Sequence, residues 1–276
     1  MSMKPLPVPA AWDEHVTAWA STLRAGGAPA TTIHQRTYWV TRLARDVELD
    51  PWDVTADVLL AWAGAHSWAR DTRRSAYAGV RQFYGWAVTR GLTDVDPSTV
   101  LPSVRQSLPA PHPCPDHVLA RALLAADAEE TLMLRLAAEA GLRRGEVARV
   151  HARDLTPDLA GTSLVVHGKG GKDRTVPLSD DLAREITDRA RGGWAFPARF
   201  GDGHMTEGAV GHKVGRLLGD GWGMHSLRHR FATRAYVGSS DLLAVQQLLG
   251  HASPTTTQRY VLVDAGRLRA AMAAAA

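Results

Sequence analysis

The sequence has one cysteine, Cys114, among its 276 residues and only four lysines, at positions 4, 169, 172 and 213. A lone cysteine cannot form an internal disulfide, and the absence of any Cys-x-x-Cys pair removes support for a structural zinc site. No apolar run approaches the roughly 18 residues of a membrane-spanning helix, and the N-terminal MSMKPLPVPA lacks the apolar stretch of a signal peptide. These absences predict a cytoplasmic protein without a membrane partner.

The net charge is +4 and the isoelectric point is about 9.5. This mild basic excess permits a polyanionic partner without requiring one. Because arginine is abundant throughout the chain, a single arginine carries little information. The two lysines at 169 and 172 are less expected in so lysine-poor a sequence, and they mark their segment for attention.

The first hundred residues predict a helical domain. Apolar residues recur at helical spacing over 11–26 and 29–49, a third helix runs to Ala65 with Asp53 or Thr55 as its cap, and a fourth runs from Asp71 or Thr72 to Gly91. Six prolines between 96 and 115 exclude a continuous helix there and favour a stiff, extended connector. We therefore expect an N-terminal domain over 1–100, a linker over 101–115 and a second domain over 116–276.

The second domain predicts helices around a small β element. SLVVHGKGGKDRTVPL, residues 163–178, alternates across a glycine-containing turn as a β-hairpin does. Helices are predicted at 116–127 and 129–140, in a short piece after Gly141, and at 179–191, 206–219, 225–237, 241–250, 254–260 and from Asp264 on. The predicted fold class is mainly α with a small β-hairpin or sheet.

Two segments of the second domain combine cations with turns. In AGLRRGEVARV, Arg143 and Glu146 follow a glycine that ends a helix. One interpretation is the start of the next helix with arginines exposed to solvent. The other is a guanidinium that a nearby carboxylate holds in place to bind a phosphate. In HGKGGKDR, Lys169, Lys172 and Arg174 put three cations on one turn. An exposed lysine at a turn tip is ordinary, but a cluster of three favours contact with a polyanion.

Two further segments supply histidines and a tyrosine. In HSLRH, His225 and Arg228 share a helix face; His225 and His229 have the spacing of a metal pair, but Ser226 stands where a zinc protease has glutamate, so no metal is predicted. In LLGHASPTTTQRY, His251 is predicted to lie in a turn and Tyr260 at the end of the next helix. A lone tyrosine is more often packing than a nucleophile, unless cations converge on it.

Together the four segments resemble the tyrosine recombinase (phage integrase) family. Its pattern is an arginine in GLRxxE, a lysine in GKGxKxR, HxLRH, an LGH histidine and a tyrosine nine residues later. Residues 140–260 contain all five in that order. Ala140, where the family commonly has threonine, and Arg230, where it often has a small residue or threonine, depart from the pattern outside its catalytic positions.

The resemblance implies a helical, SAM-like core-binding domain before an α+β catalytic domain, and SAYAGVRQFYGWAVTRG is similar to the last helix of the former. With no further domain before residue 11, a simple Xer-like or minimal phage integrase without an arm-binding domain is expected. The implied catalytic residues, which need no metal or other cofactor, are Arg143, Lys169, His225, Arg228, His251 and Tyr260. Glu146 is expected to orient Arg143.

DNA contacts are expected from both domains. In the hairpin they are Lys172 and Arg174, and on the second and fourth helices they are Thr32, Arg36, Arg73, Arg74 and Arg81. The implied partners are double-stranded recombination sites and a homotetramer assembled on them, with residues 264–275 either docking on a neighbour or forming a frayed tail. An accessory protein that sets direction remains open. Phage-type integration and excision is the leading function, with Xer-type dimer resolution, a type IB topoisomerase and an inactive DNA-binding relative as alternatives.

Overall fold

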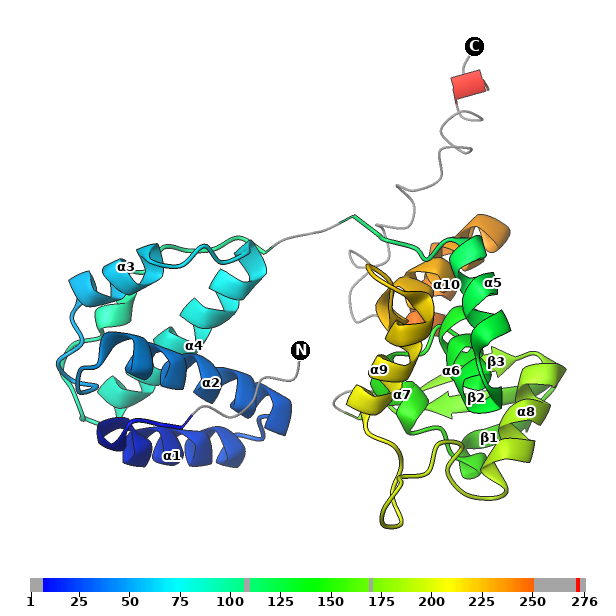
Figure 1. Ribbon diagram of the computed structural model, residues 1–276, viewed down its shortest axis with the longest axis horizontal. Coiled ribbons are helices and arrows are strands. Elements are labelled where there is room, and N and C mark those ends of the chain that lie inside the picture. The colour runs from blue at the N-terminus through cyan, green and yellow to red at the C-terminus, as the bar shows by residue number, and fades with distance from the viewer. Residues whose placement is uncertain (1–6, 107–109, 169–170, 251–271, 274–276) are drawn as a thin grey trace. The chain divides into compact units, whose positions relative to one another are not determined.

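The computed structural model describes residues 7–106, 110–168, 171–250 and 272–273. The chain divides into two compact units, residues 1–109 and 110–276. Each unit has a hydrophobic core of its own and is described by itself (Figure 1).

The first unit is a set of four helices followed by a short 3₁₀ helix. They are α1 (Ala10–Ala25), α2 (Ala30–Val47), α3 (Ala56–Gly64), α4 (Arg70–Thr89) and η1 (Pro97–Val100). The hydroxyl of Thr55 accepts a hydrogen bond from the Val58 amide and caps α3, as predicted. The predicted caps of α4 are wrong, because this helix begins at Arg70 and its N-cap residue, Ala69, provides no side-chain cap.

Aromatic side chains fill the core of the first unit. The ring of Phe83 on α4 lies 5.6 Å from that of Trp12 and 5.4 Å from that of Trp19, both on α1. Helices α2 and α4 pack closely because Gly79 has no side chain: a Cβ there would lie 3.1 Å from the Cβ of Trp39 and 3.3 Å from the carbonyl oxygen of Arg36. This close packing fixes the α2 and α4 faces that carry the predicted DNA contacts.

The second unit is built around α6. Its elements are α5 (Asp116–Ala125), α6 (Ala128–Glu139), α7 (Arg144–Ala148), η2 (Ala152–Asp154), β1 (Leu155–Asp158), β2 (Gly161–Val166), β3 (Arg174–Leu178), α8 (Asp180–Ala190), α9 (Glu207–Leu218), α10 (Met224–Ser239) and α11 (Leu242–Leu249). Leu132, Met133, Leu134 and Leu136 are fully buried, and α6 contacts α7, α8, α9 and α10. The apolar residues of α6 are buried against these neighbours, so this helix forms the centre of the unit.

A three-stranded antiparallel sheet in the order β1-β2-β3 covers one side of this core. The predicted hairpin is confirmed: β2 and β3 pair from Thr162 with Leu178 to Val166 with Arg174. Strand β1 was not predicted, because its sequence LTPD is short and exposed and does not alternate. Pro157 is tolerated there because β1 is an edge strand. The mainly α fold class is confirmed.

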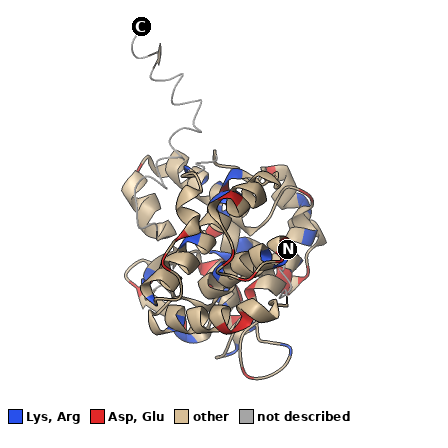
Figure 2. Ribbon diagram, turned by 90° about the vertical axis from the view of Figure 1, so that its left-hand side faces the viewer, with Lys and Arg blue, Asp and Glu red and all other residues tan. Residues whose placement is uncertain are grey.

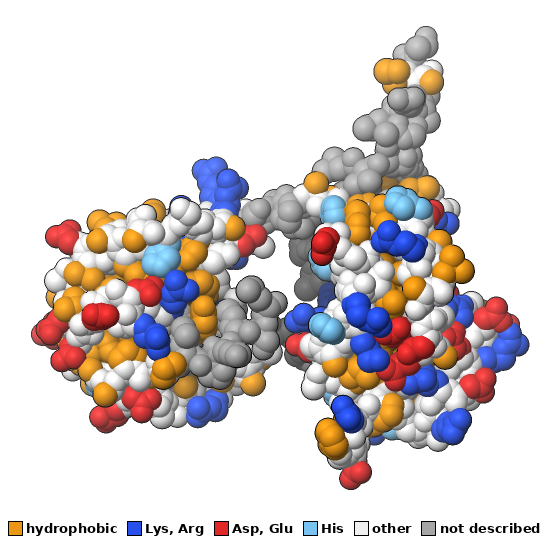
Figure 3. All heavy atoms as spheres, in the orientation of Figure 1, with side chains coloured by type: hydrophobic (Ala, Val, Ile, Leu, Met, Phe, Trp, Pro, Cys, Tyr) orange, Lys and Arg blue, Asp and Glu red, His pale blue; other side chains and the backbone are white. Residues whose placement is uncertain are grey.

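Charge by itself marks no binding face in the views shown. Lysine and arginine alternate with aspartate and glutamate along the ribbons in Figure 2, and their side chains lie intermixed on each unit's surface in Figure 3. Within the described residues, no helix is long and apolar enough to cross a membrane. The site is therefore located from specific side-chain contacts.

Candidate active site

A buried carboxylate, Glu146, lies at the centre of the site. Gly141, with φ of 66°, ends the turn after α6, and α7 then begins with Arg143 as its N-cap residue. Glu146 is the third residue of α7, so its carboxylate accepts the backbone N–H of Arg143 at 2.8 Å and the Arg143 Nη1 at 2.7 Å. The GLRRGE sequence therefore folds the arginine and the glutamate onto each other, as the sequence analysis expected.

Arg174, the first residue of β3, binds the same carboxylate from the other side. Its Nη1 and Nη2 donate to the two oxygens of Glu146 at 2.8 and 2.7 Å, and its Nε donates to the Leu248 carbonyl at 2.7 Å. Only 8% of the Arg174 side chain is exposed. Arg174 was predicted to contact DNA, whereas all three of its guanidinium nitrogens donate within the protein. It acts as a brace between the Glu146 carboxylate and the end of α11.

The charged form of Glu146 is strongly favoured. Burial acts to raise its pKa, but the bonds from Arg174 and Arg143 outweigh burial and lower the pKa to about 2. Only 4% of the side chain is exposed, so this charge is compensated by arginines rather than by water. The carboxylate stays ionised at neutral pH and fixes the guanidinium groups around it.

Arg228 joins this centre from α10. Its Nη1 donates to the Gly141 carbonyl at 2.5 Å and lies 3.8 Å from Glu146, and its Nη2 donates to the Leu249 carbonyl. Its side chain is 3% exposed, against 45% for Arg143. The structure therefore brings Arg143 and Arg228 together, with Arg143 the more open to a ligand.

The first two turns of α10 carry the two histidines of the HSLRH motif. The rings of His225 and His229 have centroids 4.2 Å apart, and His225 is exposed whereas His229 is partly buried. The Nδ1 of His229 accepts the backbone N–H of His112 at 2.9 Å. The ring of His229 is thus oriented by the segment before α5, and His225 is left facing the surface beside the buried Arg228.

The end of α11 is tied to the same centre. Its last two carbonyls, of Leu248 and Leu249, accept bonds from Arg174 and Arg228, and Gly250 follows with φ of 60°. A Cβ at Gly250 would lie 2.9 Å from the Cδ of Arg174. The arginine cluster therefore fixes the backbone immediately before residue 251.

Three predicted catalytic residues, Lys169, His251 and Tyr260, lie outside the described residues, as do the predicted helix at 254–260 and nearly all of the predicted C-terminal segment. Lys172, on the turn between β2 and β3, is exposed as a DNA contact requires. Within the described residues, no group of three or more histidine, cysteine, aspartate or glutamate side chains is arranged to hold a metal ion.

The predicted DNA contacts of the first unit differ in exposure. Arg74 is exposed, and Thr32, Arg36 and Arg73 are partly exposed. Burial and then the nearby charge of Arg74 lower the pKa of Arg36, so these two cations lie close enough to repel. Such a pair suits an anion that bridges them. Arg81 instead donates to the carbonyls of Leu101 and Pro102, at 2.5 and 3.1 Å, and holds the segment after η1.

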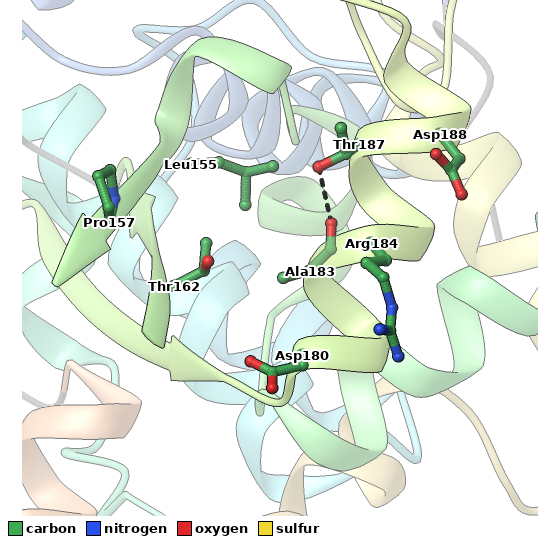
Figure 4. Close-up of a pocket in the computed structure, with 8 residues that line it drawn as sticks. All are labelled: Leu155, Pro157, Thr162, Asp180, Ala183, Arg184, Thr187 and Asp188. Atoms are coloured by element: carbon green, nitrogen blue, oxygen red, sulfur yellow. Dashed lines mark hydrogen bonds between the residues drawn. The ribbon is translucent and has the colours of Figure 1, made fainter. Parts of the chain in front are cut away.

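A large hollow of the second unit lies apart from this cluster. It has a volume of about 450 Å³ and is bounded by β1, β2 and α8 (Figure 4). Its lining residues, among them Leu155, Thr162 and Arg184, include none of the predicted site residues. It is not part of the candidate site.

A family model described as the phage integrase family matches residues 117–267. The chain belongs to this family. Its relatives include the tyrosine recombinase XerD of Caulobacter vibrioides, 30% identical over 243 residues that cover 76% of this chain and 78% of the relative. The tyrosine recombinase XerC of Mycobacterium bovis is 34% identical over 246 residues, covering 79% and 82%. The resemblance stated from the motifs is confirmed.

Solved structures of the family show the same fold. XerH site-specific recombinase, bound to a palindromic difH substrate in a post-cleavage complex, matches with a TM-score of 0.73 and 19% identity over 92% of this chain and 84% of its own. A lambda integrase dimer bound to a COC′ core site matches with a TM-score of 0.72 and 17% identity over 90% and 76%.

Proposed function

We propose that this tyrosine recombinase cuts and rejoins DNA strands at specific sites through a covalent bond between DNA and Tyr260. The observation that carries the proposal is the cluster around Glu146, where Arg143 and Arg228 lie beside one carboxylate and Arg228 also donates to the Leu249 carbonyl, two residues before residue 251. Two guanidinium groups close together suit a phosphodiester, whose nonbridging oxygens gain negative charge in the transition state.

In the proposed reaction the phenol oxygen of Tyr260 attacks phosphorus and the bond to the 5′ oxygen breaks. Arg143 and Arg228 stabilise the charge on the phosphate, and His251 adds a hydrogen bond to it. His225 assists the proton leaving the tyrosine, and Lys169 gives a proton to the departing 5′ oxygen. The 3′-phosphotyrosine conserves the energy of the broken bond, so rejoining to a new 5′ hydroxyl needs neither ATP nor a metal ion.

The first unit, together with Lys172, is proposed to hold DNA beside this site. We keep residues 1–100 as the core-binding domain and 101–115 as the linker, with Arg36 and Arg74 as a pair that takes a backbone phosphate. Strand exchange requires four active sites, so we propose a homotetramer on two DNA sites in the cytoplasm. One structural neighbour is a lambda integrase tetramer bound to a Holliday junction.

The biological role is proposed as phage-type integration and excision. The curated relatives favour a second candidate, since XerD and XerC of two bacteria are 30% and 34% identical to this chain. Integration joins two unlike sites, whereas dimer resolution joins two copies of one site. Recombination between two unlike DNA sites supports integration; recombination only between identical sites supports the Xer-type role.

The covalent step is tested with a nicked suicide duplex that carries the target site. The wild-type protein should form an adduct that resists denaturation, Tyr260→Phe should form none, and Arg143→Ala or Arg228→Ala should lose about 100-fold or more in rate. Tyr236→Phe is the matched control, because Tyr236 is a tyrosine of the same unit that is only 7% exposed. An adduct that persists in Tyr260→Phe overturns the assignment, and relaxation of plasmids without a target site favours the topoisomerase alternative.

A further inference from the structure

The turn between β2 and β3 is closed tightly at its base. Val166 and Arg174 form the last pair of the two strands, and residues 167–173 connect them. A Cβ at Gly168 would lie 2.1 Å from the carbonyl oxygen of Lys172, so the two arms of the turn touch there. The only residues between these contact points are 169, 170 and 171, and the first of them is the lysine of the GKGxKxR motif.

An imidazole bridges two carboxylates at this base. The Nδ1 of His167 lies 3.0 Å from the Oδ2 of Asp173 on the opposite arm, and its Nε2 lies 3.2 Å from the Oδ1 of Asp154 in η2. Both partners are acceptors when ionised, so both ring nitrogens donate when the histidine is protonated. The bonds to Asp154 and then Asp173 raise the pKa of His167, which favours that doubly donating form.

Asp154 anchors the bridge to the body of the unit. Its side chain is 8% exposed, whereas those of His167 and Asp173 are 49% and 48% exposed. The charged groups around the His167 ring are these two carboxylates and two arginines. The Nε of Arg153 lies 3.8 Å from the Oδ1 of Asp154, and Arg149 lines the same small hollow as His167. One end of the bridge is therefore fixed and the other holds the far arm of the turn.

Exposed ion pairs contribute little to global stability, so this bridge matters mainly for geometry. A lysine amine sits on a flexible four-carbon stem and reaches a reacting atom reproducibly only if its backbone is held. The arrangement of His167 and Asp173 ties both ends of the turn whose sequence contains Lys169 to the buried carboxylate of Asp154.

We propose that His167, with Asp154 and Asp173, is a positioning group that holds the turn so that Lys169 can protonate the departing 5′ oxygen. This inference rests on the proposed function. The step transfers one proton from the Lys169 ammonium to the 5′ oxygen as the phosphorus–oxygen bond breaks and the tyrosine–phosphorus bond forms. Loss of the bridge slows this proton transfer without altering the phosphate contacts of the arginines.

The test compares two suicide duplexes, one with the natural 5′ oxygen at the scissile bond and one with sulfur in its place. A thiolate leaves without being protonated, so the sulfur substrate does not need the general acid. His167→Ala should cleave the oxygen substrate about tenfold or more slowly and the sulfur substrate within about twofold of wild type. Asp173→Asn should show the same pattern, and His204→Ala, in a loop of the same unit, should cleave both substrates normally.

Equal slowing of His167→Ala on both substrates would mean a general structural defect, and an unchanged rate on the oxygen substrate would mean no role; either result overturns the inference. Lys169→Ala separates this inference from the proposed function. If sulfur fails to rescue Lys169→Ala, the assignment of Lys169 as general acid is wrong whatever His167 does. If sulfur rescues Lys169→Ala but not His167→Ala, the general acid stands and the positioning role falls.

Discussion

The substitution Arg174→Lys distinguishes two roles for Arg174: a brace between Glu146 and the end of α11, or a contact with DNA. The substitution keeps one positive charge, but an ammonium is a point donor and cannot span both oxygens of Glu146 while also reaching the Leu248 carbonyl. Because Arg174 is 8% exposed, water does not replace the lost bonds. We expect the change to weaken the folded second unit and to disturb Arg143, which shares the carboxylate.

The size of the effect follows from the contacts. A pKa of about 2 for Glu146, in place of the ordinary 4.5, corresponds to about 3 kcal/mol favouring its charged form in the folded protein. Arg174 supplies two of the four hydrogen bonds that favour the charged form, and a lysine can replace only one of them. Losing one hydrogen bond to a charged group costs about 1.5 kcal/mol. The bond to the Leu248 carbonyl adds about 1 kcal/mol. The free energy of unfolding should fall by about 2 to 3 kcal/mol.

Three measurements decide the matter: urea unfolding, the rate of adduct formation, and DNA affinity across a salt series. Arg174→Lys should lose stability and cleave slowly while the slope of log affinity against log salt stays unchanged. Lys172→Ala is the control, since an exposed phosphate contact should reduce that slope by about one and leave stability alone. Unchanged stability with a reduced slope in Arg174→Lys would refute the brace and restore the DNA contact.

Two further predictions concern Glu146 on α7 and Gly141 in the turn before that helix. The stabilisation from ionised Glu146 should be complete above pH 4.5, its unfolded pKa, and should be lost as the pH falls toward about 2, its folded pKa. The free energies of unfolding of the wild type and Glu146→Gln, measured with urea, should therefore converge over that range. A constant difference between them would contradict this prediction. Gly141→Ala would put a methyl group 2.4 Å from the Phe231 ring, on a residue whose φ is 66°. The free energy of unfolding should therefore fall by about 2 to 4 kcal/mol. A urea midpoint equal to that of the wild type would contradict this prediction.

The sequence predicted the elements whose periodicity is strong. The hairpin was found because SLVV and RTVPL alternate around glycines, and α6 because its apolar residues continue for three turns. Strand β1 was missed since LTPD has no alternation and contains Pro157, which only an edge strand accepts. Helix starts were predicted less well: α4 begins at Arg70 after Ala69, which provides no side-chain cap, although Asp71 and Thr72 follow within three residues.

The motifs predicted which residues form the site, but they predicted the role of each residue less well. That Glu146 holds Arg143 followed from the GLRxxE motif, because three residues of helix bring them together. The bracing part of Arg174 was missed although a signal existed: Arg174 is two residues before the buried Val176 on β3, so strand alternation turns both toward the core. That Arg174 meets Glu146 depends on tertiary packing between β3 and α7, which the spacing of the motifs does not encode.

The charge balance of the cluster matches the proposed chemistry. Arg143, Arg174 and Arg228 surround the single carboxylate of Glu146, which leaves an excess of two positive charges. In the proposed reaction a phosphodiester carries one negative charge and acquires a second as its phosphorus becomes five-coordinate, so a cluster of net positive charge attracts the transition state more strongly than the ground state. Without Glu146 the three guanidiniums would repel one another. One buried acid among three arginines therefore suits the proposed chemistry.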